Sequence, residues 1–488
     1  MSDLNITADP IAILKQEVRE IYLSDQRPWV IGYSGGKDST ATLQLIWLAL
    51  ADMTPEERTK PIYVISSDTL VETPVITNYI DRSLKKIGEE AQRLGLPIST
   101  HKVTPTTKNS FWVNLIGRGY PAPSRRFRWC TERLKIEPAN DFIKSRVAEF
   151  GEVVMVLGVR SQESATRAQV MSLHKIKGSK LSRHSSLLNA FVYAPIKDFS
   201  TDDVWDFLLQ VECPWGNDNR DLVAMYRNAQ AGECPLVVDK TTPSCGNSRF
   251  GCWVCTVVER DRAMEAMIES GEDWLEPLLD FRDMLAETQD PARKREFRDF
   301  RRKNGSVSFI GETDRPMPGP YMLAFCKTLL RRLLEVQVRI QKEAPFGEAP
   351  LLILDSELHE IRRLWRSERG DWEDSVPAIV RDVLGRDLDW VIEDAAAFTT
   401  EDGALLDEVC RAHDVPTDLV VKLVDIERAA HGLKRRHAVH TRIEDALRQE
   451  WRDVDTLIAE RRRVLGIAVT LDDGDLELDL EPTSEEEL

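Results

Sequence analysis

Two groups of residues in this sequence have types and spacing that suit chemistry. The first is the run Ser34-Gly35-Gly36-Lys37-Asp38-Ser39-Thr40, which follows the apolar stretch Trp29–Tyr33 and precedes a stretch with helical spacing. Small residues let backbone N–H groups approach a polyphosphate, and a helix N-terminus adds partial positive charge. The run therefore predicts a binding site for the phosphates of a nucleotide. A plain glycine-rich turn with Asp38 as a helix cap is the simpler alternative.

The second group consists of four cysteines, Cys234, Cys245, Cys252 and Cys255, with gaps of ten, six and two residues between them. In a large chain kept in a reducing compartment, clustered thiols indicate metal or sulfur chemistry rather than disulfides. Four convergent thiolates hold either a structural zinc ion or an iron–sulfur cluster, and the gap lengths do not separate these two. A metal centre is therefore predicted, with the metal left open.

Three side chains outside these groups also suit chemistry. Arg160 and Arg167 follow a predicted strand, and a guanidinium donates two parallel hydrogen bonds to anionic oxygens. Cys130 has several arginines as sequence neighbours, and positive neighbours lower the pKa of a thiol, so that it can carry a persulfide. The alternative is a neutral Cys130 thiol packed beneath the site. The three isolated cysteines are expected in the core: Cys213, Cys326 and Cys410.

The elements that must position these residues follow from the apolar pattern. Short apolar runs alternate with amphipathic stretches over residues 1–210, which is typical of helices wound around a parallel sheet. The sequence therefore predicts an α/β fold with a doubly wound parallel sheet. The predicted strands are Trp29–Tyr33, Ile62–Ser66, Ile98–Val103, Val153–Gly158 and Phe191–Pro195, and the helices between the first three are Ser39–Met53 and Val75–Leu94.

Composition divides the chain further. We expect a nucleotide-binding domain at residues 1–210, a Cys-rich segment at 211–260, a helical region at 261–470 and an acidic, disordered tail at 471–488. The helical region predicts three amphipathic helices in particular, Met322–Lys342, Ser356–Ser367 and Thr441–Val464.

Charge and hydropathy limit the partners. The net charge of -17 disfavours nucleic-acid binding over the whole surface, so the candidate DNA contacts are two basic stretches, His174–His184 and Arg293–Lys303. No run approaches the roughly 20 apolar residues of a membrane span, and the first ten residues lack a signal-peptide pattern. The protein is therefore expected in the cytoplasm, with no membrane partner.

The run Ser34–Thr40 resembles the SGGxDS pyrophosphate loop of the adenine-nucleotide α-hydrolase (PP-loop) superfamily, whose members split ATP between its α and β phosphates. Four further blocks resemble, in order, its phosphoadenylylsulfate reductase-like branch: Ser67-Asp68-Thr69, Arg128-Trp129-Cys130-Thr131, Gly158-x-Arg160 with Arg167, and Pro195-Ile196 with Asp202-Asp203-Val204-Trp205. The resemblance implies ATP and Mg²⁺ bound by Ser34, Gly35, Gly36, Lys37, Asp38, Ser39, Thr40, Asp68, Thr69, Arg160 and Arg167. It implies Lys37, Asp38, Arg160 and Cys130 as catalytic residues.

The cysteine region, Gly232–Pro235 with Ser244–Thr256, resembles the cluster segment of the C-subunit family of the bacterial DNA phosphorothioation (Dnd) system. The resemblance implies that Cys234, Cys245, Cys252 and Cys255 hold a [4Fe–4S] cluster. It also implies adenylation of a DNA backbone phosphate, replacement of a non-bridging oxygen by sulfur, and a cysteine desulfurase and other Dnd subunits as partners.

Three alternative functions remain. A sulfonucleotide reductase shares the core, but that branch uses a C-terminal cysteine, or an adjacent cysteine pair at its cluster, and no cysteine follows Cys410 and no two are adjacent. A tRNA-thiolating enzyme uses similar chemistry. A non-enzymatic scaffold that binds ATP and zinc within a DNA-modification complex would use the same motifs.

Overall fold

The computed structural model describes residues 10–162, 173, 174, 176, 178–228, 251–302, 306–345, 350–390, 400–430 and 437–466. The chain forms two compact units: one contains Met1–Thr106, Cys130–Leu279 and Pro345–Ala349, and the other contains Thr107–Trp129, Asp280–Ala344 and Pro350–Leu488. The domain boundaries expected at residues 210, 260 and 470 stay predictions. Four predicted features lie outside the described residues: Arg167, Cys234, Cys245 and the tail 471–488.

The first unit is built on a six-stranded sheet with the order β3-β2-β1-β4-β6-β5. All neighbouring strands are parallel except β5, which pairs antiparallel with β6. The predicted doubly wound α/β fold is confirmed. The strands are β1 (Trp29–Gly32), β2 (Ile62–Ser67), β3 (Ile98–Val103), β4 (Val153–Val156), β5 (Ser182–Arg183) and β6 (Ala190–Tyr193).

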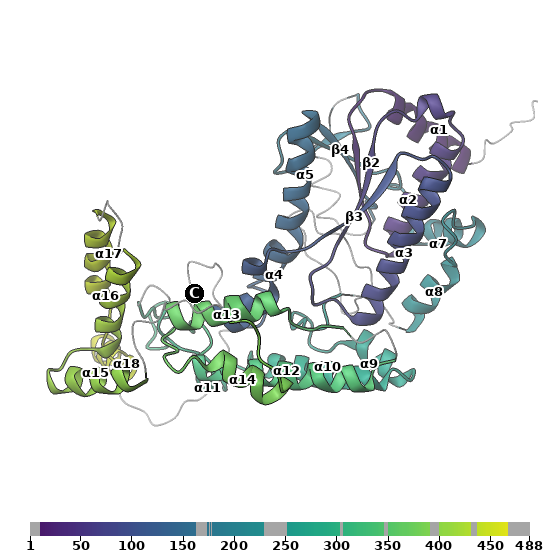
Figure 1. The fold of residues 1–488 in the computed structure, drawn as a ribbon. Helices are drawn as coiled ribbons and strands as arrows, with labels where there is room; N and C mark the ends of the chain where they lie inside the picture. The colour runs from purple at the N-terminus through teal and green to yellow at the C-terminus, as the bar shows by residue number, and fades with distance from the viewer. Residues whose placement is uncertain are drawn as a thin grey trace, which may run out of the picture. The chain divides into compact units, whose positions relative to one another are not determined.

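The central strands β1 and β4 are buried on both faces, which explains why these two strands are apolar throughout. Trp29 and Ile31 of β1 face one core together with residues of α1, α2 and α7, whereas Val30 faces the other core with Ile143 of α5. In Figure 1, α2 and α3 lie on one side of the strands and α5 on the other. The helices of this unit are α1 (Pro10–Leu23), α2 (Lys37–Ala51), α3 (Pro74–Arg93), α5 (Glu137–Phe150), α7 (Thr201–Gln210), α8 (Asn219–Asn228) and α9 (Arg262–Glu269).

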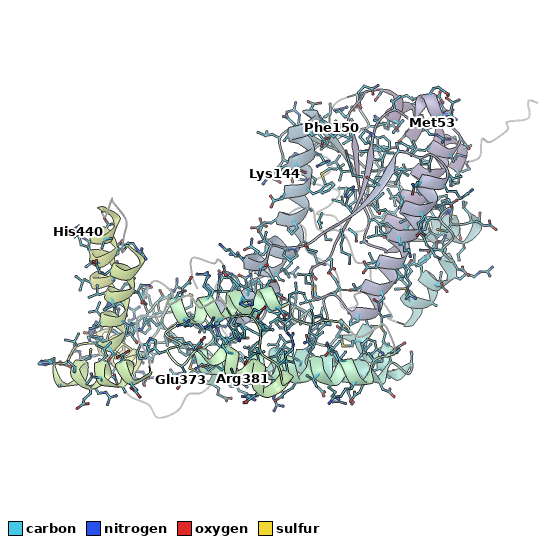
Figure 2. All side chains as sticks on the ribbon, viewed as in Figure 1. Met53, Lys144, Phe150, Glu373, Arg381 and His440 are labelled. Carbon is cyan, nitrogen blue, oxygen red and sulfur yellow. The ribbon has the colours of Figure 1, made fainter. Side chains whose placement is uncertain are left out.

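Helix α5 packs one face against the sheet and leaves the opposite face exposed. Ile143 is buried against the strands, whereas the neighbouring Lys144 is exposed and pairs with Asp141 at 3.7 Å. Figure 2 shows Lys144 on the outward side of α5 and Phe150 at its end. Two short elements precede α5: the helix α4 (Trp129–Thr131) and the π-helical turn Glu132–Ile136.

The second unit is helical, as predicted for the C-terminal region. Its helices are α11 (Lys294–Phe297), α12 (Leu323–Glu343), α13 (Asp355–Glu368), α14 (Ser375–Leu384), α15 (Thr400–Ala412), α16 (Thr417–Ala429), α17 (His437–Arg448) and α18 (Val454–Leu465), and α10 (Glu276–Glu287) crosses from the first unit into it. The single helix predicted over Thr441–Val464 is wrong. Residues 449–453 separate α17 from α18, because Asp453 caps the N-terminus of α18 by accepting a hydrogen bond from the Thr456 N–H.

The second unit also includes Thr107–Trp129, a segment that interrupts the first unit in sequence. Two buried indoles hold it there: Trp112 Nε1 donates to the Leu352 carbonyl at 2.6 Å, and Trp365 Nε1 donates to the Ile116 carbonyl at 2.9 Å. Gly117 allows the close approach, since a Cβ there would lie 2.9 Å from Leu364. Over the described residues, no helix combines the length and the apolar character needed to span a bilayer.

The basic stretch Arg293–Lys303 is largely used for internal contacts. Lys294 and Arg298 are buried, and Arg298 donates to the carbonyls of Gly319 and Pro318. Arg301 donates to the carbonyls of Glu450 and Arg452. The stretch does not form one helix: among its described residues only Lys294–Phe297 is helical, and its contact with DNA stays a prediction.

Candidate functional site

The loop after β1 is held in shape by hydrogen bonds to a serine hydroxyl. The Ser39 hydroxyl donates to the Gly36 carbonyl at 2.9 Å and accepts from the Ser34 N–H at 3.2 Å. Gly35 has a φ of +72°, a conformation that favours glycine, and a Cβ there would lie 3.0 Å from Ile80 of α3. Gly36 then caps α2 with an extended backbone. The result is a loop of small residues at a helix N-terminus, which suits a phosphate group.

Three charged side chains of the predicted set meet beside this loop. The Asp38 carboxylate accepts from Arg160 Nε at 2.6 Å and from Lys37 Nζ at 3.0 Å. Lys37 and Arg160 are only 2% and 1% exposed. Two buried cations thus contact one carboxylate beside the loop, and donors of this kind suit an anionic ligand. The sequence-predicted residues Lys37, Asp38 and Arg160 are brought together, although their catalytic roles stay predictions.

This charged group lies where the order of the strands reverses. The chain runs from β1 to β2 and β3 on one side, and to β4 and β6 on the other. In open α/β sheets, ligands bind at such a switch point, outside the carboxyl ends of the strands. Gly158, just after β4, packs against the start of α2, since a Cβ there would lie 2.6 Å from the Asp38 carbonyl oxygen. Any side chain at Gly158 would displace the loop or Arg160.

Two contacts of the charged group were not anticipated from the sequence. Arg160 Nη1 donates to Thr201 Oγ1 at 3.3 Å. The Tyr226 hydroxyl of α8 accepts from the Lys37 N–H at 3.3 Å, and the Lys37 ammonium lies 5.5 Å from the centre of the Tyr226 ring. Tyr226 also packs edge-on against Trp205 of α7. The only sequence signal for Tyr226 was its position on an amphipathic stretch, which does not distinguish it from a core residue.

The second predicted nucleotide segment follows β2. Asp68 Oδ1 accepts from the Leu70 N–H at 2.8 Å, and Asp68 Oδ2 pairs with Lys102 at 3.1 Å. Thr69 is fully buried, and its hydroxyl lies 3.0 Å from Glu72 Oε1 and 3.3 Å from Cys252 Sγ. The binding of a nucleotide by Asp68 and Thr69 therefore stays a prediction, whereas the contact of Thr69 with a cysteine is new.

Cys252 and Cys255 lie on a tight turn that is fastened to this same loop. The Cys255 N–H donates to the Cys252 carbonyl at 3.1 Å, and Cys252 forms an isolated antiparallel bridge with Glu72. Burial raises the pKa of the Cys252 thiol well above its usual range, and the nearby Glu72 carboxylate adds to that rise. Without a cation, Cys252 is therefore a neutral thiol and a poor nucleophile.

The donor set fits a metal. Cys252 and Cys255 lie on one Cys-x-x-Cys turn, and a bound cation would supply the positive charge that favours their thiolate forms. Among the described residues, no three potential metal-binding side chains come together, and Cys234 and Cys245 lie outside those residues. The roles of the four cysteines, of ATP and of Mg²⁺ stay predictions.

Other predicted residues are placed as follows. Cys130 lies on α4 and is partly exposed, so a persulfide role is sterically open and stays a prediction. Cys326 and Cys410 are buried, and Cys213 packs against the main core, as expected. In the stretch His174–His184, Lys180 pairs with Glu17 at 2.5 Å, and Arg183 is exposed on β5.

The comparisons agree with this geometry. Residues 28–257 match the phosphoadenosine phosphosulfate reductase domain. The uncharacterized protein MJ0066 of Methanocaldococcus jannaschii is 25% identical over 242 residues, which cover 50% of this chain and 39% of that protein. The chain thus spans well under half of that relative.

Two solved structures are also similar. Phosphoadenylyl-sulfate reductase from Candida auris, in a phosphate complex, is 15% identical over 43% of this chain and 89% of its own, with a TM-score of 0.26. The U34-tRNA thiolase NcsA from Methanococcus maripaludis, with its [4Fe-4S] cluster, is 15% identical over 45% of this chain and 72% of its own, also with a TM-score of 0.26. At these values the likenesses do not bear on activity.

The matched residues contain the loop Ser34–Thr40, Arg160 at the strand switch point, and the Cys252–Cys255 turn. The predicted branch of the superfamily thus agrees with the matching domain. Residues 28–257 of this chain are thus similar to the phosphoadenosine phosphosulfate reductase domain.

Proposed function

We propose that this protein is an ATP-dependent sulfurtransferase that introduces phosphorothioate groups into DNA. The observation that carries the proposal is that the Cys252–Cys255 turn is fastened to the loop after β2, beside the strand whose own loop suits a polyphosphate. The proposed activating site and the proposed sulfur site would thus lie side by side at the carboxyl ends of β1 and β2. DNA, a cysteine desulfurase and the other Dnd subunits are the proposed partners.

In the proposed reaction, a non-bridging oxygen of a DNA phosphate attacks the α-phosphorus of ATP, and pyrophosphate leaves. A sulfur nucleophile at the oxidation level of hydrosulfide then attacks the DNA phosphorus. AMP leaves with the original DNA oxygen, and sulfur remains on the DNA. Both steps are displacements at phosphorus, so they need placed positive charge more than a strong general base.

The residues of the chain have separate tasks in this scheme. The backbone N–H groups of Gly35 to Lys37 and the Lys37 ammonium would bind the departing pyrophosphate, and a bound Mg²⁺ would supply further positive charge to the phosphates. Asp38 holds Arg160 in place, and Arg160 would neutralise charge that develops on the α-phosphate. An iron–sulfur cluster at Cys234, Cys245, Cys252 and Cys255 would supply a thiophilic metal centre at which sulfur is held.

The test is a paired assay on anaerobically purified protein with ATP, duplex DNA, a cysteine desulfurase and cysteine. The proposal predicts DNA-dependent formation of AMP and pyrophosphate, and phosphorothioate dinucleotides after nuclease digestion. Lys37→Ala should abolish both products. Formation of AMP with tRNA but not with DNA would favour a tRNA-thiolating enzyme, and no AMP with either would favour a scaffold.

A second candidate, reduction of a sulfonucleotide, is favoured by the domain that residues 28–257 match. In that case the loop would bind the phosphate of phosphoadenylylsulfate instead of splitting ATP. Release of sulfite from that substrate in the presence of a thiol reductant, without any need for ATP or DNA, would replace the first proposal by this one.

A further inference from the structure

Main-chain pairing fixes the position of Cys252 relative to the loop after β2. The Trp253 N–H donates to the Val71 carbonyl at 3.0 Å, and the Thr73 N–H donates to the Gly251 carbonyl at 3.2 Å. The Thr73 hydroxyl donates to the same Gly251 carbonyl at 2.9 Å. Cys252 is therefore held from both sides, in the manner of a short strand paired with the loop.

Side chains complete this contact. The Thr69 hydroxyl lies 3.3 Å from Cys252 Sγ and 3.0 Å from Glu72 Oε1. The Glu72 carboxylate also lies 3.8 Å from Cys252 Sγ and 3.5 Å from Lys135 Nζ. Thr69 is 0% exposed, so its partners are these protein groups rather than bulk water. This is a built environment for one sulfur atom, made by residues about 180 positions away.

The direction of the hydrogen bond depends on what Cys252 binds. A thiol donates its proton to Glu72, whereas a metal-bound thiolate has no proton and can only accept. The neighbouring donor is then the Thr69 hydroxyl, because a carboxylate cannot donate. In this structure that hydroxyl donates to Glu72 Oε1 at 3.0 Å and lies 3.3 Å from the sulfur, so its proton would turn from the carboxylate to the thiolate. Hydrogen bonds to ligand sulfur stabilise the more negative state of a metal centre and fix the ligand's orientation.

We propose that Thr69 is a positioning residue for the sulfur site: its hydroxyl donates a hydrogen bond to the metal-bound Cys252 sulfur and so sets the reduction potential and the metal retention of the centre. This assigns to Thr69 a task different from the nucleotide contact expected from the sequence. The inference rests on the proposed function insofar as that function places a metal at Cys252.

The experiment uses the anaerobically purified full chain and three variants. Thr69→Val keeps the shape and removes the hydroxyl, Thr69→Ser keeps the hydroxyl, and Thr73→Val is the matched control. Thr73 lies in the same loop and bonds the same cysteine segment, but through a carbonyl oxygen and not through sulfur. Iron, zinc and acid-labile sulfide content, the midpoint potential, and the rate of metal loss to a chelator are measured for each.

The expected result is a lower midpoint potential in Thr69→Val, together with metal loss roughly tenfold faster than in the unaltered protein. Thr69→Ser and Thr73→Val should match the unaltered protein in both properties. If Thr69→Val has the unaltered potential and rate, or if Thr73→Val shifts them equally, the proposal is overturned. If Thr69→Val does not fold, Thr69→Ser and Thr69→Ala are compared instead. A midpoint potential or a rate of metal loss in Thr69→Ser that differs from that of the unaltered protein overturns the proposal. Unaltered values in Thr69→Ser, together with shifted values in Thr69→Ala, support it.

The outcomes also separate this proposal from the proposed function. In the first outcome, the unaltered chain binds metal, Cys252→Ser does not, and Thr69→Val has no effect. The proposed function then stands, while the Thr69 proposal fails. A shifted potential in Thr69→Val, with no phosphorothioate formed by any variant, supports the Thr69 proposal while the proposed function fails. If the unaltered chain holds no metal and cannot be distinguished from Cys252→Ser, both the Thr69 proposal and the proposed function are overturned.

Discussion

The phosphate end and the cysteine end of this site lie at one edge of the same sheet but differ in charge. At the phosphate end, the buried cations Lys37 and Arg160 share the Asp38 carboxylate. At the cysteine end, Glu72 pairs with Lys135 and faces the neutral thiol of Cys252. The first end brings two buried cations together, whereas the second brings a carboxylate and a thiol sulfur together. An anion therefore suits one end and a cation the other.

The largest expected effect comes from removing positive charge at the phosphate end. Arg160→Met should slow ATP cleavage roughly 100-fold, as for loss of one preorganised donor, and should destabilise the fold by about 3–5 kcal/mol because a buried ion pair is broken. Arg160→Lys keeps the positive charge but cannot make both hydrogen bonds, to Asp38 and to Thr201. Its rate of ATP cleavage and its stability should therefore lie between those of Arg160→Met and the unaltered protein. Release of AMP and urea unfolding measure these effects, and an unaltered rate in Arg160→Met would end the electrostatic argument.

A steric change at the same end should have a smaller effect. Gly158→Ala places a Cβ about where the Asp38 carbonyl lies, so it should cost about 1–3 kcal/mol of stability and weaken pyrophosphate binding. Gly88→Ala, in the middle of α3, is the control, since its Cβ meets only the flexible side chain of Thr100; it should be neutral or stabilising by about 0.5–1 kcal/mol. Equal losses in both variants would show that the approach of β4 to α2 is unimportant.

Tyr226 offers a subtler change at the phosphate end. Tyr226→Phe keeps the ring beside the Lys37 ammonium but removes the oxygen that accepts the Lys37 N–H, so a phosphate should take over as its acceptor. We expect pyrophosphate to bind about two- to fivefold more tightly, and more weakly in Tyr226→Ala, which also removes the cation–π contact. Titration calorimetry with pyrophosphate distinguishes the two. Weaker binding in Tyr226→Phe would mean that the hydroxyl itself contacts the ligand.

The smallest expected effect is a change of the free energy of unfolding with pH, and it concerns the buried carboxyl group of Glu357. Glu357 is 1% exposed, and burial raises the pKa of its carboxyl group. A raised folded-state pKa contributes stability below the ordinary pKa, and that stability is lost as pH rises through the folded value. The free energy of unfolding of the unaltered protein should therefore fall relative to that of Glu357→Gln as pH rises above the ordinary glutamate pKa of about 4.3.

Glu360 on the same helix provides a control of opposite sign. Hydrogen bonds from Arg363 hold the pKa of the Glu360 carboxyl below its usual range. Glu360 therefore contributes stability above its ordinary pKa, and that stability is lost as pH falls. The free energy of unfolding of Glu360→Gln should be lower than that of the unaltered protein near neutral pH, and the difference should vanish in acid. If urea unfolding gives the same pH trend for Glu357→Gln and Glu360→Gln, the assignment for Glu357 is wrong.

Local patterns were enough to predict that the residues of the phosphate end lie together, whereas their binding of phosphate stays a prediction. The loop Ser34–Thr40 and its strand and helix are neighbours in sequence, and Arg160 follows a strand whose apolar run is unmistakable. The cysteine end depends on contacts such as Thr69 with Cys252, which lie 183 residues apart, and no periodicity encodes such a pairing. The same applies to Gly158, whose role depends on the backbone of Asp38, and to Thr107–Trp129, which two indoles attach to the helical unit.

Metal analysis of the cysteine end tests the central claim most directly. Iron, zinc and acid-labile sulfide are measured on the anaerobically purified chain and on Cys252→Ser with Cys255→Ser, and ATP cleavage is followed in the same samples. The account predicts about four irons and four sulfides per chain, lost in the double variant, while pyrophosphate binding persists. One zinc without sulfide, or metal that survives the double substitution, would contradict a sulfur-transfer site at this turn.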